Sequence, residues 1–174
     1  MVSKRTEQAF HLIERLRLNH FIITNDDGSP YLLRTRLSPD RDWWRKELKL
    51  PGVFPHFFFR SDSDREIHNH PWEWSVSIIL TGGYWEERYD PMIRATRRRL
   101  FKPGSINCIQ RETFHRVELV DAEAGCWTLF IAGPKILADG EWGFMNRDGT
   151  GFEACNARDA RLKVKRQNGV NQHA

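Results

Sequence analysis

The chain has few cysteines, and they lack the spacing of a disulfide framework. Its 174 residues include 3 cysteines, Cys108, Cys126 and Cys155, an odd number with no C-x-x-C pair. Cys108 and Cys126 stand in apolar, strand-like stretches, so we expect buried free thiols rather than disulfide bonds.

Long apolar runs are also missing. No run approaches the roughly 18 residues that a membrane-spanning helix needs, which argues against a transmembrane role. Residues 1–19 are charged throughout, and they lack the apolar central block and small-residue cleavage site of a signal peptide. We therefore expect a cytoplasmic protein without a membrane partner.

Charge of one sign is not strongly in excess. The chain holds 27 Lys and Arg against 23 Asp and Glu, for a net charge of +4. Basic and acidic residues alternate nearly everywhere except at residues 94–99 and 158–166. We interpret these two stretches as a solvated strand face and a tail, and we do not expect nucleic acid as a partner.

The composition that remains is that of one globular domain. Hydrophobic residues make up 40% and charged residues 29% of the chain, both ordinary values for a soluble fold. A chain of this length buries about two-thirds of its unfolded surface. One hydrophobic core is therefore expected.

The two ends of the chain differ from its middle. Apolar residues recur at helical spacing over residues 5–18, which predicts an amphipathic helix. Dense turn chemistry follows over residues 25–30. From residue 156 onward apolar residues are sparse, which indicates a loosely ordered basic tail. We therefore divide the chain into an N-terminal helix and turn (1–30), a β-rich body (31–155) and a tail (156–174).

The body reads as a series of short strands separated by turns. Several such strands, with no helical pattern between them, are typical of an antiparallel sandwich or barrel, so we predict an all-β fold. The first predicted strand, residues 31–37, suits a sheet edge. The last stretch, residues 141–145, is either a strand or a flap. The predicted strands cover residues 31–37, 53–60, 75–80, 83–89, 95–101, 105–109, 114–120, 126–132 and 141–145.

The most informative stretch runs from His68 to Gly83, H-N-H-P-W-E-W-S-V-S-I-I-L-T-G-G. Side chains alternate faces along a strand, so His68 and His70 project to the same side, roughly 7 Å apart along the chain. This geometry suits two imidazoles that bind one metal ion. A lone histidine in a strand is more often structural, but two at this spacing favour a site.

The stretch resembles the cupin superfamily through two motifs. In the first, G-x5-H-x-H-x3-4-E-x6-G, the places of the two histidines and the last glycine hold His68, His70 and Gly82, while Ser75 stands at the glutamate and Asp62 at the first glycine. In the second, G-x5-P-x-G-x2-H-x3-N, Gly104 and His115 keep their spacing, and the other three places hold Gln110, Glu112 and Leu119. The resemblance spans residues 53–132, and the H-x-H-P-W and W-G-F stretches make the chain similar to small uncharacterised bacterial and phage cupins.

The resemblance implies a double-stranded β-helix, or jelly roll, that holds a divalent metal through His68, His70 and His115. Imidazole donors suit Fe, Mn, Ni, Zn or Cu, and iron(II) is the expected ion because some thiol dioxygenases of the superfamily use such a triad. Ser75 removes the usual fourth ligand. Glu73 either supplies that ligand in its place or hydrogen-bonds one histidine from behind.

Several other residues are weaker candidates. We consider Glu73, Tyr84, Glu86 and His56 as catalytic groups, since Tyr84 and Glu86 share one face of a predicted strand and His56 precedes the histidine pair. Candidates for binding a substrate are Arg60, Arg98 and Trp142.

Three functions remain open at this point. The first is a metal-dependent enzyme, of non-haem iron dioxygenase type, that acts on a small polar molecule. The second is an isomerase or epimerase of sugars or other metabolites, with or without metal, and the third is a non-catalytic ligand-binding or nucleic-acid-associated module. Cupins often pair through sheet edges, so a homodimer through residues 31–37 is a further expectation.

Overall fold

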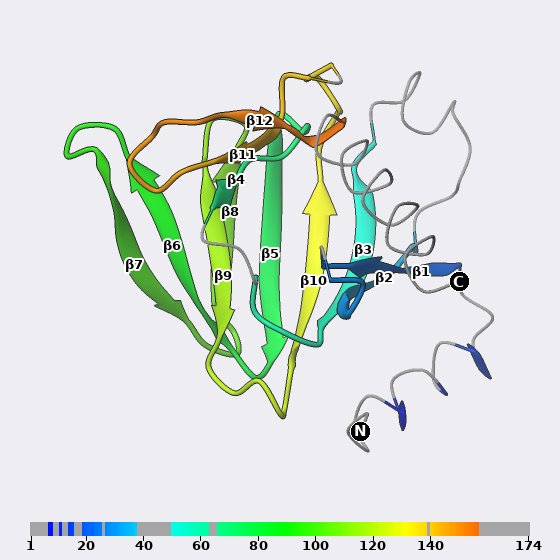
Figure 1. Ribbon diagram of the computed structural model, residues 1–174. Helices are drawn as coiled ribbons and strands as arrows, with labels where there is room; N and C mark the ends of the chain where they lie inside the picture. Colours follow the sequence, from blue (N-terminus) through cyan, green and yellow to red (C-terminus); the bar gives the residue numbers. More distant parts are fainter. Residues whose placement is uncertain are drawn as a thin grey trace, which may run out of the picture.

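Two antiparallel six-stranded sheets form the body of the protein in the computed structural model (Figure 1). The structure describes residues 7, 8, 11, 14, 15, 19–25, 27–37, 50–62, 66–138 and 140–156. Within these residues no helix has the length and apolar character needed to cross a membrane.

Each sheet joins strands that are far apart in the sequence. In order, the first sheet holds β1 (His20–Thr24), β2 (Pro30–Thr35), β3 (Gly52–Phe58), β10 (Cys126–Ala132), β5 (Trp74–Thr81) and β8 (Ile106–Gln110). The second sheet holds β12 (Glu153–Ala154), β11 (Gly143–Met145), β4 (Ile67–His68), β9 (His115–Leu119), β6 (Tyr84–Asp90) and β7 (Ala95–Phe101). This arrangement is the predicted jelly roll.

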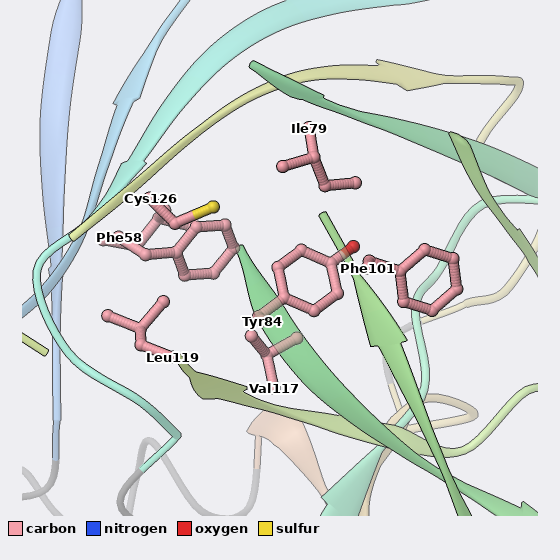
Figure 2. Packing of buried hydrophobic residues seen from close by; sticks show 8 residues of the cluster. Phe58, Ile79, Tyr84, Phe101, Val117, Leu119 and Cys126 are labelled. Atoms are coloured by element: carbon pink, nitrogen blue, oxygen red, sulfur yellow. The ribbon is translucent and has the colours of Figure 1, made fainter. Parts of the chain in front are cut away.

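The hydrophobic core lies between the two sheets. Side chains alternate between buried and half-buried along all seven residues of β10, as expected for a strand with one face on the core. Both sheets contribute to the main cluster (Figure 2), whose buried members are Leu32, Phe58, Ile79, Tyr84, Phe101, Val117, Leu119 and Cys126. Burial of each large apolar side chain stabilises the fold by about 1.5–3 kcal/mol, so the cluster fixes how the sheets stack.

Most predicted strands are confirmed, and the differences lie at the edges. β7 and β10 have the predicted bounds, and the other predicted strands begin and end within two residues of the observed ones. The prediction that residues 31–37 form a sheet edge was wrong, because β2 lies between β1 and β3. The edge is β1, a short strand that the sequence analysis missed together with β4 and β12.

The cysteine prediction is confirmed in part. All three cysteines are free, but only Cys126 is buried, while Cys108 is exposed and Cys155 half-buried. The burial of Cys108 was predicted wrongly because exposed and buried residues alternate along β8, and the phase of that alternation places Cys108 on the outer face.

The two predicted terminal segments lie largely outside the described residues. Of the helix predicted over residues 5–18 only residues 7, 8, 11, 14 and 15 are described; they are helical, but they are too few to establish the helix. The predicted tail over residues 156–174 lies outside them except for Asn156.

Candidate metal centre

Three histidines converge between β4 and β9. Their candidate ligand atoms all lie within 4.8 Å of one another, and this is the group that could hold a metal ion among the described residues: His68, His70 and His115. His68 ends β4 and pairs directly with His115, the first residue of β9. His70 follows two residues later, so strand pairing, rather than proximity in sequence, brings the third histidine to the other two.

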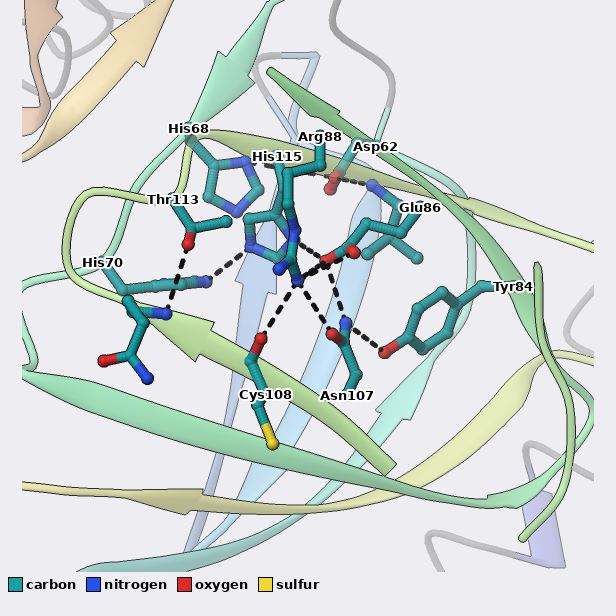
Figure 3. Close-up of polar contacts among 12 residues, drawn as sticks. Asp62, His68, His70, Tyr84, Glu86, Arg88, Asn107, Cys108, Thr113 and His115 are labelled. Atoms are coloured by element: carbon teal, nitrogen blue, oxygen red, sulfur yellow. Dashed lines mark hydrogen bonds and ion pairs between the residues drawn. The ribbon is translucent and has the colours of Figure 1, made fainter. Parts of the chain in front are cut away.

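The spacing of the nitrogen atoms suits a single ion. Nε2 of His70 lies 2.9 Å from Nε2 of His115, and the rings of His68 and His70 lie 5.1 Å apart between centroids (Figure 3). Two imidazoles bound side by side at about 2.1 Å from one ion would place their nitrogens about 3 Å apart. The donor set therefore fits a divalent metal without rearrangement of the chain.

Glu86 stands behind His115, on the side away from the other histidines. Its Oε1 lies 2.7 Å from Nδ1 of His115 (Figure 3). β6 pairs with β9, which puts Glu86 opposite Val117 and diagonal to His115, within reach of its side chain. Because the carboxylate of Glu86 can only accept a hydrogen bond, the proton of neutral His115 is on Nδ1 and its lone pair is on Nε2, the nitrogen that faces His70.

A small polar network holds Glu86 in place. Asn107 on β8 donates to Oε1 of Glu86 at 2.8 Å, and Arg88 lies 2.9 Å from Oε2. Burial alone would raise the pKa of Glu86, but the hydrogen bond and charge of His115, the hydrogen bond of Asn107 and the charge of Arg88 outweigh burial and lower the pKa to about 2. Glu86 is therefore an anion at every physiological pH.

His70 is also kept in the neutral state that binds metal, and His68 has a carboxylate nearby. Burial, followed by the neighbouring His115 and His68, holds the pKa of His70 well below its ordinary value, so His70 is neutral near pH 7. A carboxylate oxygen of Asp62 lies 4.0 Å from Nδ1 of His68 and accepts a hydrogen bond from the backbone of Val117 at 2.6 Å. Asp62 thus places a negative charge behind His68, as Glu86 does behind His115.

The triad opens into a cavity of about 530 Å3 between the sheets. This volume is within the range of sites for small molecules. The walls are mostly apolar and aromatic, and they include Phe58, Trp72, Ile109, Phe130, Trp142 and Phe144. The charged residues of the lining are Arg34, Asp62, Glu66 and Lys135.

The structure brings several of the predicted candidates to this site. His56, Tyr84 and Trp142 line the cavity, and Glu86 holds His115 from behind. Burial is the main reason why the pKa of Tyr84 is raised to about 12, against the opposing hydrogen bond of Asn107. The indole Nε1 of Trp142 is buried without a hydrogen-bond partner among the described residues.

Other candidates lie elsewhere. Glu73 is exposed and does not line the cavity, so the structure does not bring it to the histidines. Arg60 is also exposed and outside the lining. Arg98 pairs with Glu118 at 2.9 Å and lies over the ring of Trp85 at 4.7 Å, on a face that the cavity does not reach.

Sequence reasoning missed four polar residues of the site. They are Arg34, Asp62, Arg88 and Asn107. One of them had a signal: Arg34 shares a strand face with apolar Leu32, an unusual place for a polar side chain that faces solvent.

Comparison with known proteins places the fold in a class. No family model matches this chain, and no curated protein matches its sequence. Among solved structures, iron(II) HppE superposes with a TM-score of 0.50 at 10% identity, over 66% of this chain and 56% of HppE. A variant of Bacillus subtilis oxalate decarboxylase superposes with a TM-score of 0.51 at 9% identity, over 72% of this chain and 29% of that one.

Both neighbours are cupin-fold proteins, and at these identities the likeness establishes the fold alone. The chain therefore has the fold of the cupin superfamily, with a three-histidine cluster inside its barrel. It spans about half of the HppE chain and less than a third of the decarboxylase chain.

Proposed function

We propose that this protein is a metal-dependent enzyme of non-haem iron dioxygenase type that acts on a small polar molecule. The observation that carries the proposal is the convergence of His68, His70 and His115 in the wall of one cavity. Three protein ligands leave open positions on the ion, as catalytic metal sites require.

The donor set leaves the charge of the ion largely uncompensated. All three candidate ligands are imidazoles, and the carboxylates of Glu86 and Asp62 lie behind them rather than in the cluster. A neutral set of ligands favours an anionic or strongly polar molecule in the open positions. Bound there, iron would supply the one-electron chemistry that reactions of O2 require.

The chain's own residues orient the metal ligands and bind the molecule that enters the cavity. Glu86 keeps the proton of His115 on Nδ1, so that Nε2 stays available as a ligand. The mostly apolar and aromatic walls make the surroundings of a bound molecule less polar than water, which strengthens its polar interactions with the protein. With a pKa raised to about 12, Tyr84 keeps its phenolic proton near pH 7 and can donate it in a hydrogen bond to a bound molecule.

Iron(II) is the ion of choice in this proposal, ahead of zinc, manganese or nickel. Imidazole ligands accept all of these ions. HppE, which shares the fold, was crystallised in an iron(II) form, and that likeness supports the choice.

A second candidate is an isomerase or epimerase of small metabolites. It is favoured by His56 and Tyr84, which line the same cavity and could serve as acid and base. The two functions differ in their need for O2. Turnover that continues under strictly anaerobic conditions would support the isomerase.

Elemental analysis of protein purified without chelators tests the metal centre. We expect close to one iron per chain in the wild type and in His20→Ala, an exposed histidine, and only traces in His115→Ala. Nitric oxide, a stable analogue of O2, should give a paramagnetic signal with the iron-loaded wild type and none with His115→Ala. A wild-type protein with no transition metal, or one whose metal content is unchanged by His115→Ala, would overturn the proposal.

A further inference from the structure

Arg34 is one of two cations in the cavity lining, with Lys135, that the function proposed above does not use. It lies on β2, half-buried, and lines the same cavity as the histidine triad. Its neighbours across the strands are Phe21 on β1 and His56 on β3. The register of the first sheet therefore places an arginine on the inner face of the barrel.

The guanidinium of Arg34 is held in one orientation. Its Nε donates to Nε2 of His56 at 2.9 Å, and its Cζ lies 5.6 Å from the ring centre of Phe54 and 5.7 Å from that of Trp72. His56 is itself stacked on Phe130, with ring centroids 4.9 Å apart. A side chain fixed in this way loses little conformational entropy when it binds a ligand.

His56 acts in this pair as a neutral acceptor. Burial, followed by the charge of Arg34, holds the pKa of His56 well below its ordinary value. With its proton on Nδ1, His56 accepts from Arg34 without neutralising the positive charge. The pair therefore positions a cation in the wall of the cavity instead of cancelling it.

Arg34 stands one aromatic ring away from the histidine triad. Trp72 lies between them: its ring centre is 5.7 Å from Cζ of Arg34 and 5.6 Å from the ring of His70. Lys135, which also lines the cavity, forms a β-bridge with Trp72. The acids of the lining are Asp62 and Glu66, and Asp62 lies 4.0 Å from Nδ1 of His68.

We propose that Arg34, positioned by His56, binds a carboxylate of the substrate while the substrate's other polar end reaches the histidine triad. A carboxylate suits this site because the planar fork of a guanidinium donates two parallel hydrogen bonds to its two oxygens. The substrate class is thus a small organic acid that also carries a hydroxyl, thiol or second acid group. This inference rests on the metal centre proposed above for the second contact.

Calorimetric titration of the iron-loaded protein with simple probes tests the inference. The probes are 3-hydroxypropionate and 4-hydroxybutyrate, each compared with the diol of equal length, 1,3-propanediol or 1,4-butanediol. We expect the hydroxy acids to bind at least about 10-fold more tightly than the diols, because a charge-assisted pair in a mostly apolar cavity adds that much. Equal binding of acids and diols by the wild type would overturn the inference.

Variants test whether Arg34 is the residue that makes hydroxy acids bind more tightly than diols. Arg34→Gln should weaken binding of the hydroxy acids by about 10- to 100-fold and leave the diols unchanged. Arg34→Lys, which keeps the charge but loses the fork, should give an intermediate affinity. Arg94→Gln removes the same charge from an exposed turn and should bind as the wild type does. Unchanged affinity for the acids in Arg34→Gln would overturn the inference.

Two further measurements separate this inference from the metal centre. Circular dichroism shows whether each variant is folded. If Arg34→Gln does not fold, the affinities of Arg34→Lys and the comparison of acids with diols in the wild type test the inference in its place. His115→Ala, which should lack metal, should bind all probes more weakly but keep the preference for acids. A wild type without metal that still prefers acids through Arg34 would refute the metal centre and leave the carboxylate site standing.

Discussion

Oε1 of Glu86 lies 2.7 Å from Nδ1 of His115, and both side chains are almost completely buried. This contact fixes which nitrogen of His115 faces the other two histidines. It also explains how a site whose motif position holds Ser75 in place of a glutamate keeps a carboxylate close to the metal ligands. The acid acts through His115, as a positioning residue.

Replacement of Glu86 by Gln should weaken metal binding. The amide keeps the size of the carboxylate, but it lacks the charge that holds the Nδ1 proton of His115, and partners of this kind typically contribute 10- to 100-fold to metal affinity. Competition with a chromogenic chelator measures the change.

Glu87→Gln is the matched control for that variant. Glu87 follows directly on β6 and pairs with Arg147 at 3.0 Å, on the opposite face of the strand from Glu86. Its metal affinity should equal that of the wild type. Equal losses in both variants would show that strand β6 is merely destabilised and that Glu86 has no special role.

The metal-free protein should lose stability as the pH falls below 6.5, partly because of His56. Its pKa is lowered in the folded state by burial, then by Arg34, whereas in the unfolded chain it stays near 6.5. Below pH 6.5 only the unfolded chain therefore takes up the proton, and the stabilisation present above that pH is lost. The loss is at most about 1.4 kcal/mol per pH unit.

His56→Gln isolates this effect, because it keeps an acceptor for Arg34 but does not titrate. Between pH 6.5 and 5.5 the melting temperature of the wild type should fall about 2–4 °C further than that of the variant. Thermal melts in the presence of a chelator measure both curves. Parallel curves would show that His56 takes up its proton equally well in the folded state.

Gly82→Ala should destabilise the fold strongly. Gly82 has a φ of +72°, and a Cβ there would lie 2.3 Å from the backbone oxygen of Gly125, so the β5–β6 turn would have to move. Gly104 also has a positive φ, +86°, but a Cβ there would meet nothing within 4 Å. Gly104→Ala should therefore cost about 1 kcal/mol from backbone strain alone, and Gly82→Ala at least about 2 kcal/mol more. Urea unfolding compares them, and equal losses would contradict the close approach.

The three thiols should react at different rates. Cys108 is exposed and Cys126 buried, and burial raises the pKa of Cys126 to about 11, which suppresses its reactive thiolate. A disulfide reagent should modify Cys108 rapidly in the folded protein and Cys126 only on unfolding. Cys108→Ser should remove the fast phase. A fast phase that survives in the double variant Cys108→Ser, Cys155→Ser would contradict the orientation of β8.

The amino-acid sequence by itself determined most of the strands and, through two motifs, all three candidate metal ligands. Alternating apolar residues and turn residues are local signals, so β7 and β10 were predicted at their bounds. His68 and His70 are also close in sequence, and His115 was added by the spacing of a second motif. Which face of the sheet a given side chain occupies was harder to predict. The alternation along β8 can place Cys108 on either face, and only packing against the core decides which one.

Only the tertiary structure decided which charged residues accompany the histidines. Glu73 lies only three residues after His70 in sequence, yet Glu86 is the acid that contacts His115, because β6 pairs with β9. In the same way Arg34, and not Arg60, lines the cavity, because β2 lies between β1 and β3 in a register that points Arg34 inward. Strand order and register depend on pairings between distant segments, and the energies that select them come from the whole core, which no short stretch of sequence contains.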